Sequence, residues 1–201
     1  ASRGLGDVYK RQAEYKAKGW ENVICYGMGS TLDDVKNAAS AEKNIVCSAA
    51  AIKAAEYLKE KFGTPYEIEY PQSCLPEEIV QKADNFADKN VLVIHNQTAA
   101  DAVRKLFTEK SGGHCTAATF FMQKKELSQQ SDFFLADESD LCDNVGDNYD
   151  VVIADKTLRR VMKNFSGEFI DFPHFGLSGR LLQGESENCL LYTSDAADDT
   201  P

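Results

Sequence analysis

Short apolar runs recur along the chain, separated by segments with helical spacing. Runs rich in β-branched and aromatic residues predict buried strands at 22–26, 44–47, 66–70, 90–94, 115–121, 149–154 and 168–172. Amphipathic or capped stretches between them predict helices at 49–62, 77–88 and 98–110, and a helical turn at 157–162. This alternation predicts an α/β fold with a parallel sheet covered on both faces. We expect two Rossmann-like parallel-sheet units, over residues 13–86 and 87–188.

The two ends of the chain point to a different origin from its middle. Residues 7–12, Asp-Val-Tyr-Lys-Arg-Gln, and residues 189–194, Cys-Leu-Leu-Tyr-Thr-Ser, can be encoded by one short DNA element read in opposite directions. That element resembles the transposon end used in sequencing libraries. We therefore expect residues 1–12 and 189–201 to be translated adapter sequence, to be set aside like a fusion scar, and the chain between them to be a fragment.

Composition narrows the classes of function. The 201 residues carry a formal net charge of −10, and their basic side chains are scattered, whereas nucleic-acid-binding proteins carry a basic stripe. No apolar run approaches the roughly 20 residues of a membrane helix, and residues 1–12 lack the apolar core of a secretory signal. The six cysteines include no Cys-x-x-Cys pair, which argues against a local zinc or thioredoxin motif. We expect a cytoplasmic protein with reduced thiols and neither a nucleic-acid nor a membrane partner.

The residues that follow the predicted strands are candidates for a ligand site, because ligands of parallel sheets bind beyond the carboxyl ends of the strands. Those ends hold Gly27–Ser30, Cys47–Ser48, His95–Gln97, Asp155 and Pro173–His174. Gly27 and Gly29 match part of a dinucleotide fingerprint, but Leu32 stands where the third glycine belongs, which favours a tight turn. No Walker A sequence is present, so we expect neither NAD nor ATP to bind directly.

Four of these residues carry candidate chemistry. Cys47 precedes a helix N-terminus, where backbone N–H groups favour the thiolate that soft metals bind; the alternative is a small buried hydrophobe. His174 could ligate a metal through a neutral ring nitrogen, and His95 could donate a proton to a bound ligand; for both, the alternative is a packing histidine. Asp155 either faces a ligand or caps the following helical turn.

Several stretches resemble the nitrogenase component 1 family. Gly29-Ser-Thr-Leu-Asp-Asp-Val35, Asn44-Ile-Val-Cys47 and Glu60-Lys-Phe-Gly-Thr-Pro65 are similar to the alpha-subunit of its molybdenum-iron protein. There, a glycine-rich turn leads to a strand ending in a cysteine, and a helix ends in Lys-Tyr/Phe-Gly-Ile-Pro. Phe169-Ile-Asp-Phe-Pro-His174, followed by Ser178-Gly179, is similar to the segment that carries the family's histidine ligand.

The resemblance implies a role for each candidate. Cys47 and His174 would bind the two ends of a metal cofactor, and His95 would be a proton donor. Cofactor-binding residues would be Gly27, Gly29, Ser48, Asn96 and Ser178. The cofactor would be an iron-sulfur cluster or another iron-containing metallocluster, and electrons would come from an ATP-hydrolysing iron protein. The chain would be the middle and C-terminal parts of an oxidoreductase subunit that pairs with a sister component 1 subunit in a heterotetramer. The cysteines for the bridging cluster would lie in an N-terminal domain that precedes it.

One departure from the family changes the expected ligand. Where the molybdenum-iron protein has Tyr-Arg-Ser-Met after the cysteine, this chain has Ser48-Ala-Ala-Ala51, which enlarges the site and removes positive charge. A different cluster, or a larger organic substrate such as a tetrapyrrole, would then fit. Two alternatives stay open: a non-catalytic cofactor-assembly scaffold of the same fold, and a small-molecule binding module that needs no iron.

Overall fold

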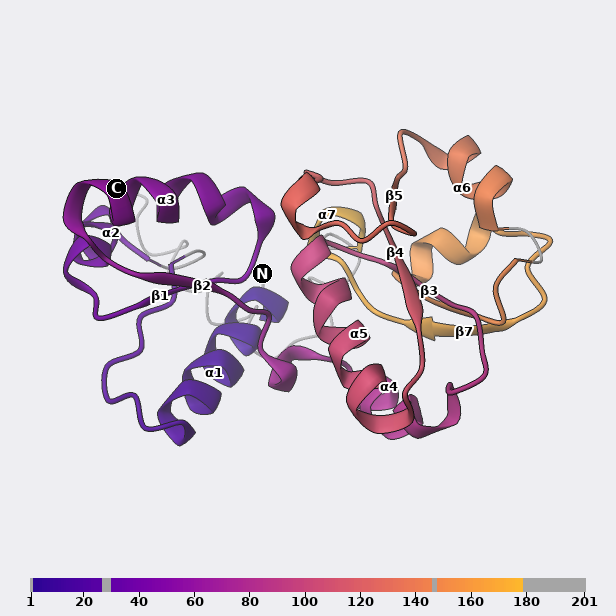
Figure 1. Ribbon diagram of the computed structural model, residues 1–201, viewed down its shortest axis with the longest axis horizontal. Coiled ribbons are helices and arrows are strands. Elements are labelled where there is room, and N and C mark those ends of the chain that lie inside the picture. The colour runs from indigo at the N-terminus through magenta and orange to yellow at the C-terminus, as the bar shows by residue number, and fades with distance from the viewer. Residues whose placement is uncertain (1, 27–29, 146–147, 179–201) are drawn as a thin grey trace, which may run out of the picture.

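The computed structural model describes residues 2–26, 30–145 and 148–178, and these residues form two parallel sheets (Figure 1). Strands β1 (Asn44–Val46) and β2 (Tyr66–Ile68) form the first sheet. The second has five strands: β3 (Val91–Ile94), β4 (Cys115–Thr119), β5 (Phe133–Phe134), β6 (Val151–Ala154) and β7 (Glu168–Asp171). The predicted α/β class with two parallel-sheet units is confirmed.

Seven α-helices are described. They are α1 (Ser2–Ala17), α2 (Leu32–Lys36), α3 (Ile52–Phe62), α4 (Glu77–Lys82), α5 (Gln97–Ser111), α6 (Glu138–Val145) and α7 (Phe175–Ser178). Shorter 3₁₀ turns include η2 (Ala49–Ala51), η4 (Ala83–Asn85) and η6 (Lys156–Arg160). None of the described helices is both long enough and apolar enough to cross a bilayer.

Local chemistry explains how the first unit is built. Thr31 caps α2 in a capping box with Asp34, as its position before two acidic residues indicates. The Ser48 hydroxyl accepts a hydrogen bond from the Ala50 N–H and starts the turn that leads into α3. Gly63 ends α3 in the left-handed conformation, with φ of 76°, as predicted for a C-cap glycine.

The five-stranded sheet has the order β5-β4-β3-β6-β7, which is the Rossmann order, and the chain reverses direction across the sheet between β3 and β6. Alternate residues of β3 face opposite layers. Val91 and Val93 pack in the core that includes α4 and α5, whereas Leu92 and Ile94 pack in the core that includes α6 and η6. Both faces are therefore covered, as predicted (Figure 1).

The predicted strand at 22–26 is wrong. These residues pair with no described strand, and Ile24 and Tyr26 are 49% and 40% exposed. An apolar run forms a strand only where a neighbouring backbone accepts its hydrogen bonds, and here the Val23 carbonyl accepts from the Gln12 side chain instead.

Three other elements differ from what the sequence predicts. Strand β4 stops at Thr119 rather than at 121, because the Thr119 hydroxyl accepts the Phe121 N–H at 3.0 Å in place of a ladder partner. Strand β5 was not predicted, since its two residues are too few to show a period. The helix predicted over 77–88 is α4 followed by the separate turn η4.

Candidate functional site

The candidate site lies at the carboxyl edge of the five-stranded sheet, around the switch point between β3 and β6. His95 follows β3, Asp155 follows β6 and His174 lies just beyond β7. The end of β1 reaches the same edge, because the Thr98 hydroxyl at the start of α5 donates to the Cys47 carbonyl at 2.6 Å. The structure therefore brings His95, Asp155 and His174 together and places the Cys47 backbone against the same helix start.

His95 is a buried, neutral imidazole. Its ring stacks on Phe172, with centroids 4.1 Å apart, and the His174 ring meets it edge-on at 4.7 Å. Nε2 lies 3.3 Å from the Pro173 carbonyl, and because a carbonyl only accepts, Nε2 carries the proton. Nδ1 is then a buried acceptor with no hydrogen-bond partner among the residues that the structure describes. Burial, reinforced by the His174 charge, lowers the pKa of His95 to about 3.

His174 is fixed on three sides. Its backbone N–H donates to Asp155 Oδ2 at 2.8 Å, and its ring stacks on Phe121 with centroids 3.9 Å apart and planes 12° apart. Its Nδ1 lies 3.0 Å from the Gly176 backbone nitrogen. An amide N–H can only donate, so Nδ1 is unprotonated and the proton of the neutral ring is on Nε2. Burial lowers the pKa of His174, which keeps the ring neutral near pH 7.

Asp155 joins the ends of β6 and β7. Its Oδ1 accepts from the backbone N–H and the hydroxyl of Thr157, which confirms the predicted capping role. Burial alone would raise the pKa of Asp155, but hydrogen bonds from Ser178, Thr157 and His174 lower it below its ordinary value. The ligand-site candidate Ser178 is itself buried. It contacts this carboxylate, so in this structure it supports the turn that carries His174.

The pKa of Cys47 in the protein without a ligand does not favour the thiolate that the sequence predicts. Burial raises the pKa of the Cys47 thiol to about 11, and the nearby Arg11 charge only partly opposes this rise. Cys74 and Cys25 also act on this pKa, a grouping that their separation in sequence did not indicate. In the described part of the chain, no three His, Cys, Asp or Glu side chains are arranged to hold a metal ion.

The remaining predicted cofactor-binding residues fall in two groups. Ser48 and Asn96 both act as helix caps: the Ser48 hydroxyl accepts from the Ala50 N–H, and Asn96 Oδ1 accepts from the Ala99 N–H at 2.9 Å. Gly27 and Gly29 lie outside the described residues. A ligand role for these four residues stays a prediction.

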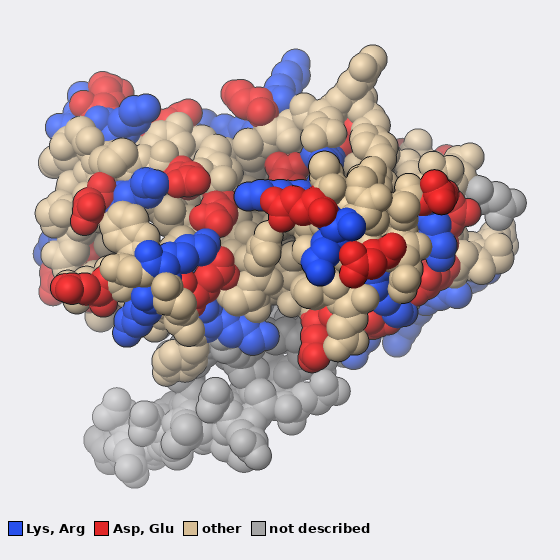
Figure 2. Space-filling view, turned by 60° about the horizontal axis from the view of Figure 1, so that its bottom comes forward, with Lys and Arg blue, Asp and Glu red and all other residues tan. Residues whose placement is uncertain are grey.

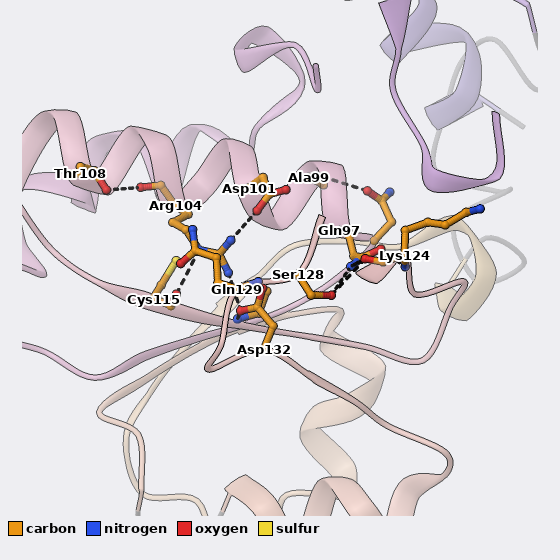
Figure 3. A network of polar contacts seen from close by, with 12 residues as sticks. Gln97, Ala99, Asp101, Arg104, Thr108, Cys115, Lys124, Ser128, Gln129 and Asp132 are labelled. Atoms are coloured by element: carbon orange, nitrogen blue, oxygen red, sulfur yellow. Dashed lines mark hydrogen bonds and ion pairs between the residues drawn. The ribbon is translucent and has the colours of Figure 1, made fainter. Parts of the chain in front are cut away.

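A polar network beneath the site was not predicted from the sequence (Figure 3). Gln97, at the start of α5, accepts from the Lys124 N–H at 2.7 Å and donates to the Lys124 carbonyl at 3.0 Å and to the Ser128 hydroxyl at 2.9 Å. About two helical turns further along α5, the buried Arg104 forms ion pairs with Asp132, at 2.6 Å, and with Asp101. These contacts fasten the 120–132 segment, which carries Phe121, to α5. A signal was present in the sequence, since Gln97 directly follows a strand end.

A small cavity lies beside this network. The space in which the centre of a water molecule can lie is about 10 Å³. The residues around it include His95, Gln97, Thr119, Gln123 and Asp132. That is room for about one water. On the face drawn in Figure 2, acidic and basic side chains are interspersed rather than gathered by sign.

Comparison with known proteins gives a fold. No family model matches the chain, and no curated protein matches it in sequence. A solved structure described as "Nitrogenase Cp1 at pH 6.5" matches it with a TM-score of 0.51. This chain is similar in fold to a nitrogenase. The match covers 83% of this chain at 14% identity, and this chain spans about half (50%) of the solved nitrogenase chain.

Proposed function

We propose that residues 13–86 and 87–188 are the middle and C-terminal parts of a nitrogenase-component-1-like oxidoreductase subunit. In this proposal the whole protein receives electrons from an ATP-hydrolysing iron protein and, with a sister subunit, reduces a substrate at a metallocluster or tetrapyrrole site. The observation that supports it best is the contact between the His95 and His174 rings at the sheet edge where the Cys47 backbone meets α5, in a chain whose fold matches a nitrogenase. Residues 1–12 and 189–201 remain proposed adapter sequence.

The donor chemistry of this edge fits an iron-containing group. A cysteine sulfur and imidazole nitrogens are ligands that iron accepts, and the buried Nδ1 of His95 is an acceptor that nothing in the described chain satisfies. Cys47 would hold one end of the group and His174 the other, through Nε2, since Gly176 occupies Nδ1. The group would supply redox chemistry when bound. The chain's own contribution is to orient both ligands, to exclude water and to keep His95 neutral with its proton on Nε2.

The test compares cofactor retention by two cysteine variants of the full-length protein. Purified without oxygen, Cys47→Ala should lose most of the iron or pigment that the wild type retains. Cys142→Ala removes an exposed thiol on α6 and should retain the wild-type content. Equal cofactor content in Cys47→Ala and wild type would remove Cys47 from the ligand set.

A cofactor-assembly scaffold is the second candidate, favoured by one observation. The residues that follow Cys47 are small, Ser48-Ala-Ala-Ala51, which suits a ligand that is held loosely and passed on. A scaffold would bind cofactor and release it to an acceptor protein, without turnover in the presence of the iron protein. The small-molecule module would bind its ligand equally well after iron is removed.

A further inference from the structure

The Phe121 ring covers one face of His174. The two rings are nearly parallel, at 12°, with centroids 3.9 Å apart. Phe121 is itself fastened, because the Thr119 hydroxyl accepts from its N–H at 3.0 Å and donates to its carbonyl at 3.2 Å. A stacked ring restricts rotation about the side-chain torsions of its partner, so the plane of the His174 imidazole is set by a residue 53 positions away in sequence.

Gly176 adds the second constraint on the same ring. Its N–H donates to His174 Nδ1 at 3.0 Å, and a Cβ at this position would lie 3.1 Å from Phe121 Cε1 and 3.2 Å from His174 Nδ1. A side chain here would therefore press on both rings of the stack. Even an alanine Cβ would require these rings to shift by a few tenths of an ångström, away from the geometry that glycine allows.

We propose that Phe121 and Gly176 are positioning residues for His174, which fix its ring plane and its tautomer. With Nδ1 occupied, His174 presents Nε2 as its available ring nitrogen, and in the protein without a ligand this atom carries the proton. Nε2 of His174 can therefore donate a hydrogen bond to an acceptor atom of a ligand. Ligation of a metal at Nε2 would require that proton to leave. The inference rests on the proposed function only for the identity of the ligand.

The network of Figure 3 supports this arrangement from below. Gln97 binds both backbone groups of Lys124, three residues after Phe121, and Asp132 accepts from the Gln129 N–H at 2.8 Å and the Ala117 N–H at 2.9 Å. Both ends of the 120–132 segment are thus tied to buried side chains. Phe121 is held by the protein's interior rather than by its stacking partner alone.

The test reads the imidazole directly, in the 201-residue chain labelled with ¹⁵N-histidine. Long-range ¹H–¹⁵N correlation spectra should show His174 as the Nε2–H tautomer, with its ring protons shifted upfield by the Phe121 ring. Phe121→Leu should abolish the upfield shift, and Phe121→Tyr, which keeps the stacked ring, should restore it. Phe134→Leu is the matched control, since Phe134 is 49% exposed on β5 and should leave the His174 signals unchanged. Gly176→Ala should mix the two tautomers.

Two outcomes would overturn the inference. One is a wild-type His174 with its proton on Nδ1, a result that needs no variant. The other is an unchanged His174 ring-proton shift in a Phe121→Leu protein that unfolds as cooperatively as the wild type. Neither readout requires a cofactor. The proposed redox function would fail in a different way, through the absence of cofactor from the full-length protein, so the two failures can be told apart.

Discussion

Asp132 should be far more important for stability than Asp101, although both bind the Arg104 guanidinium. The Asp132 side chain is 5% exposed and that of Asp101 is 38% exposed, while Arg104 is 8% exposed. Asp132 also accepts the backbone N–H groups of Ala117 and Gln129. Its removal leaves a buried cation whose single remaining carboxylate partner is the more exposed Asp101, and it leaves two amides unsatisfied.

The expected magnitudes follow from this difference in burial. Breaking a buried ion pair from one side costs about 3–5 kcal/mol, whereas a more exposed pair contributes about 0–1 kcal/mol. We expect the larger loss in the free energy of unfolding for Asp132→Ala and the smaller one for Asp101→Ala. The double variant Arg104→Met, Asp132→Leu, which removes both buried charges, should unfold at a higher urea concentration than Asp132→Ala.

Urea unfolding followed by circular dichroism measures all three variants against the wild type, with the midpoint and the slope fitted separately. If Asp132→Ala and Asp101→Ala lowered the free energy of unfolding equally, by less than about 1 kcal/mol, the buried ion pair would not be what fastens the 120–132 segment.

Two further predictions concern pH and the chain ends. Partial burial of the Asp101 carboxyl raises its pKa from 3.8 to about 6, although the Arg104 charge opposes the rise, so the folded state holds this proton more tightly than the unfolded state does. Urea titrations of the wild type and Asp101→Asn at several pH values measure this effect. The free energy of unfolding of the wild type, relative to that of Asp101→Asn, should fall as the pH rises from 3.8 to 6. A relative stability that rises over this range would contradict the raised pKa of Asp101. A chain of residues 13–188 should keep cooperative unfolding and lose only about 1–2 kcal/mol. It gives up the Gln12 bond to Val23, the Ser73 bond to the Lys10 carbonyl and the Arg11 contact with Tyr70, but no described residue of 1–12 belongs to the apolar cores of the two sheets. Non-cooperative unfolding of that chain would count against the adapter origin of residues 1–12.

The sequence contained most of the information needed for the second unit. Strands β3 and β6 are continuous apolar runs, as expected for strands buried on both faces, and the polar residues after them lie at the switch point. The failures were local. The 22–26 run is as apolar as a strand but pairs with none of the described strands, and such pairing is decided by tertiary structure rather than by the local sequence pattern.

The candidate site was predicted as a set of residues but not as an arrangement. Strand ends placed His95, Asp155 and His174 together, because parallel strands share one carboxyl edge. The Phe121 stack and the Gln97 contacts depend on how the 120–132 segment folds back, which a polar stretch does not encode in any period. The Cys47 pKa was predicted in the wrong direction because the helix dipole was weighed without the burial that outweighs it.

We propose that this chain belongs to a redox subunit that receives electrons from an ATP-hydrolysing iron protein. The most direct test mixes the full-length protein and its sister subunit with reduced iron protein in a stopped-flow spectrometer, with and without MgATP. We expect the iron protein to be oxidised only when both MgATP and the full-length protein are present. If the iron protein stays reduced while the full-length protein still binds its ligand, the chain is a scaffold or binding module and the redox assignment is wrong.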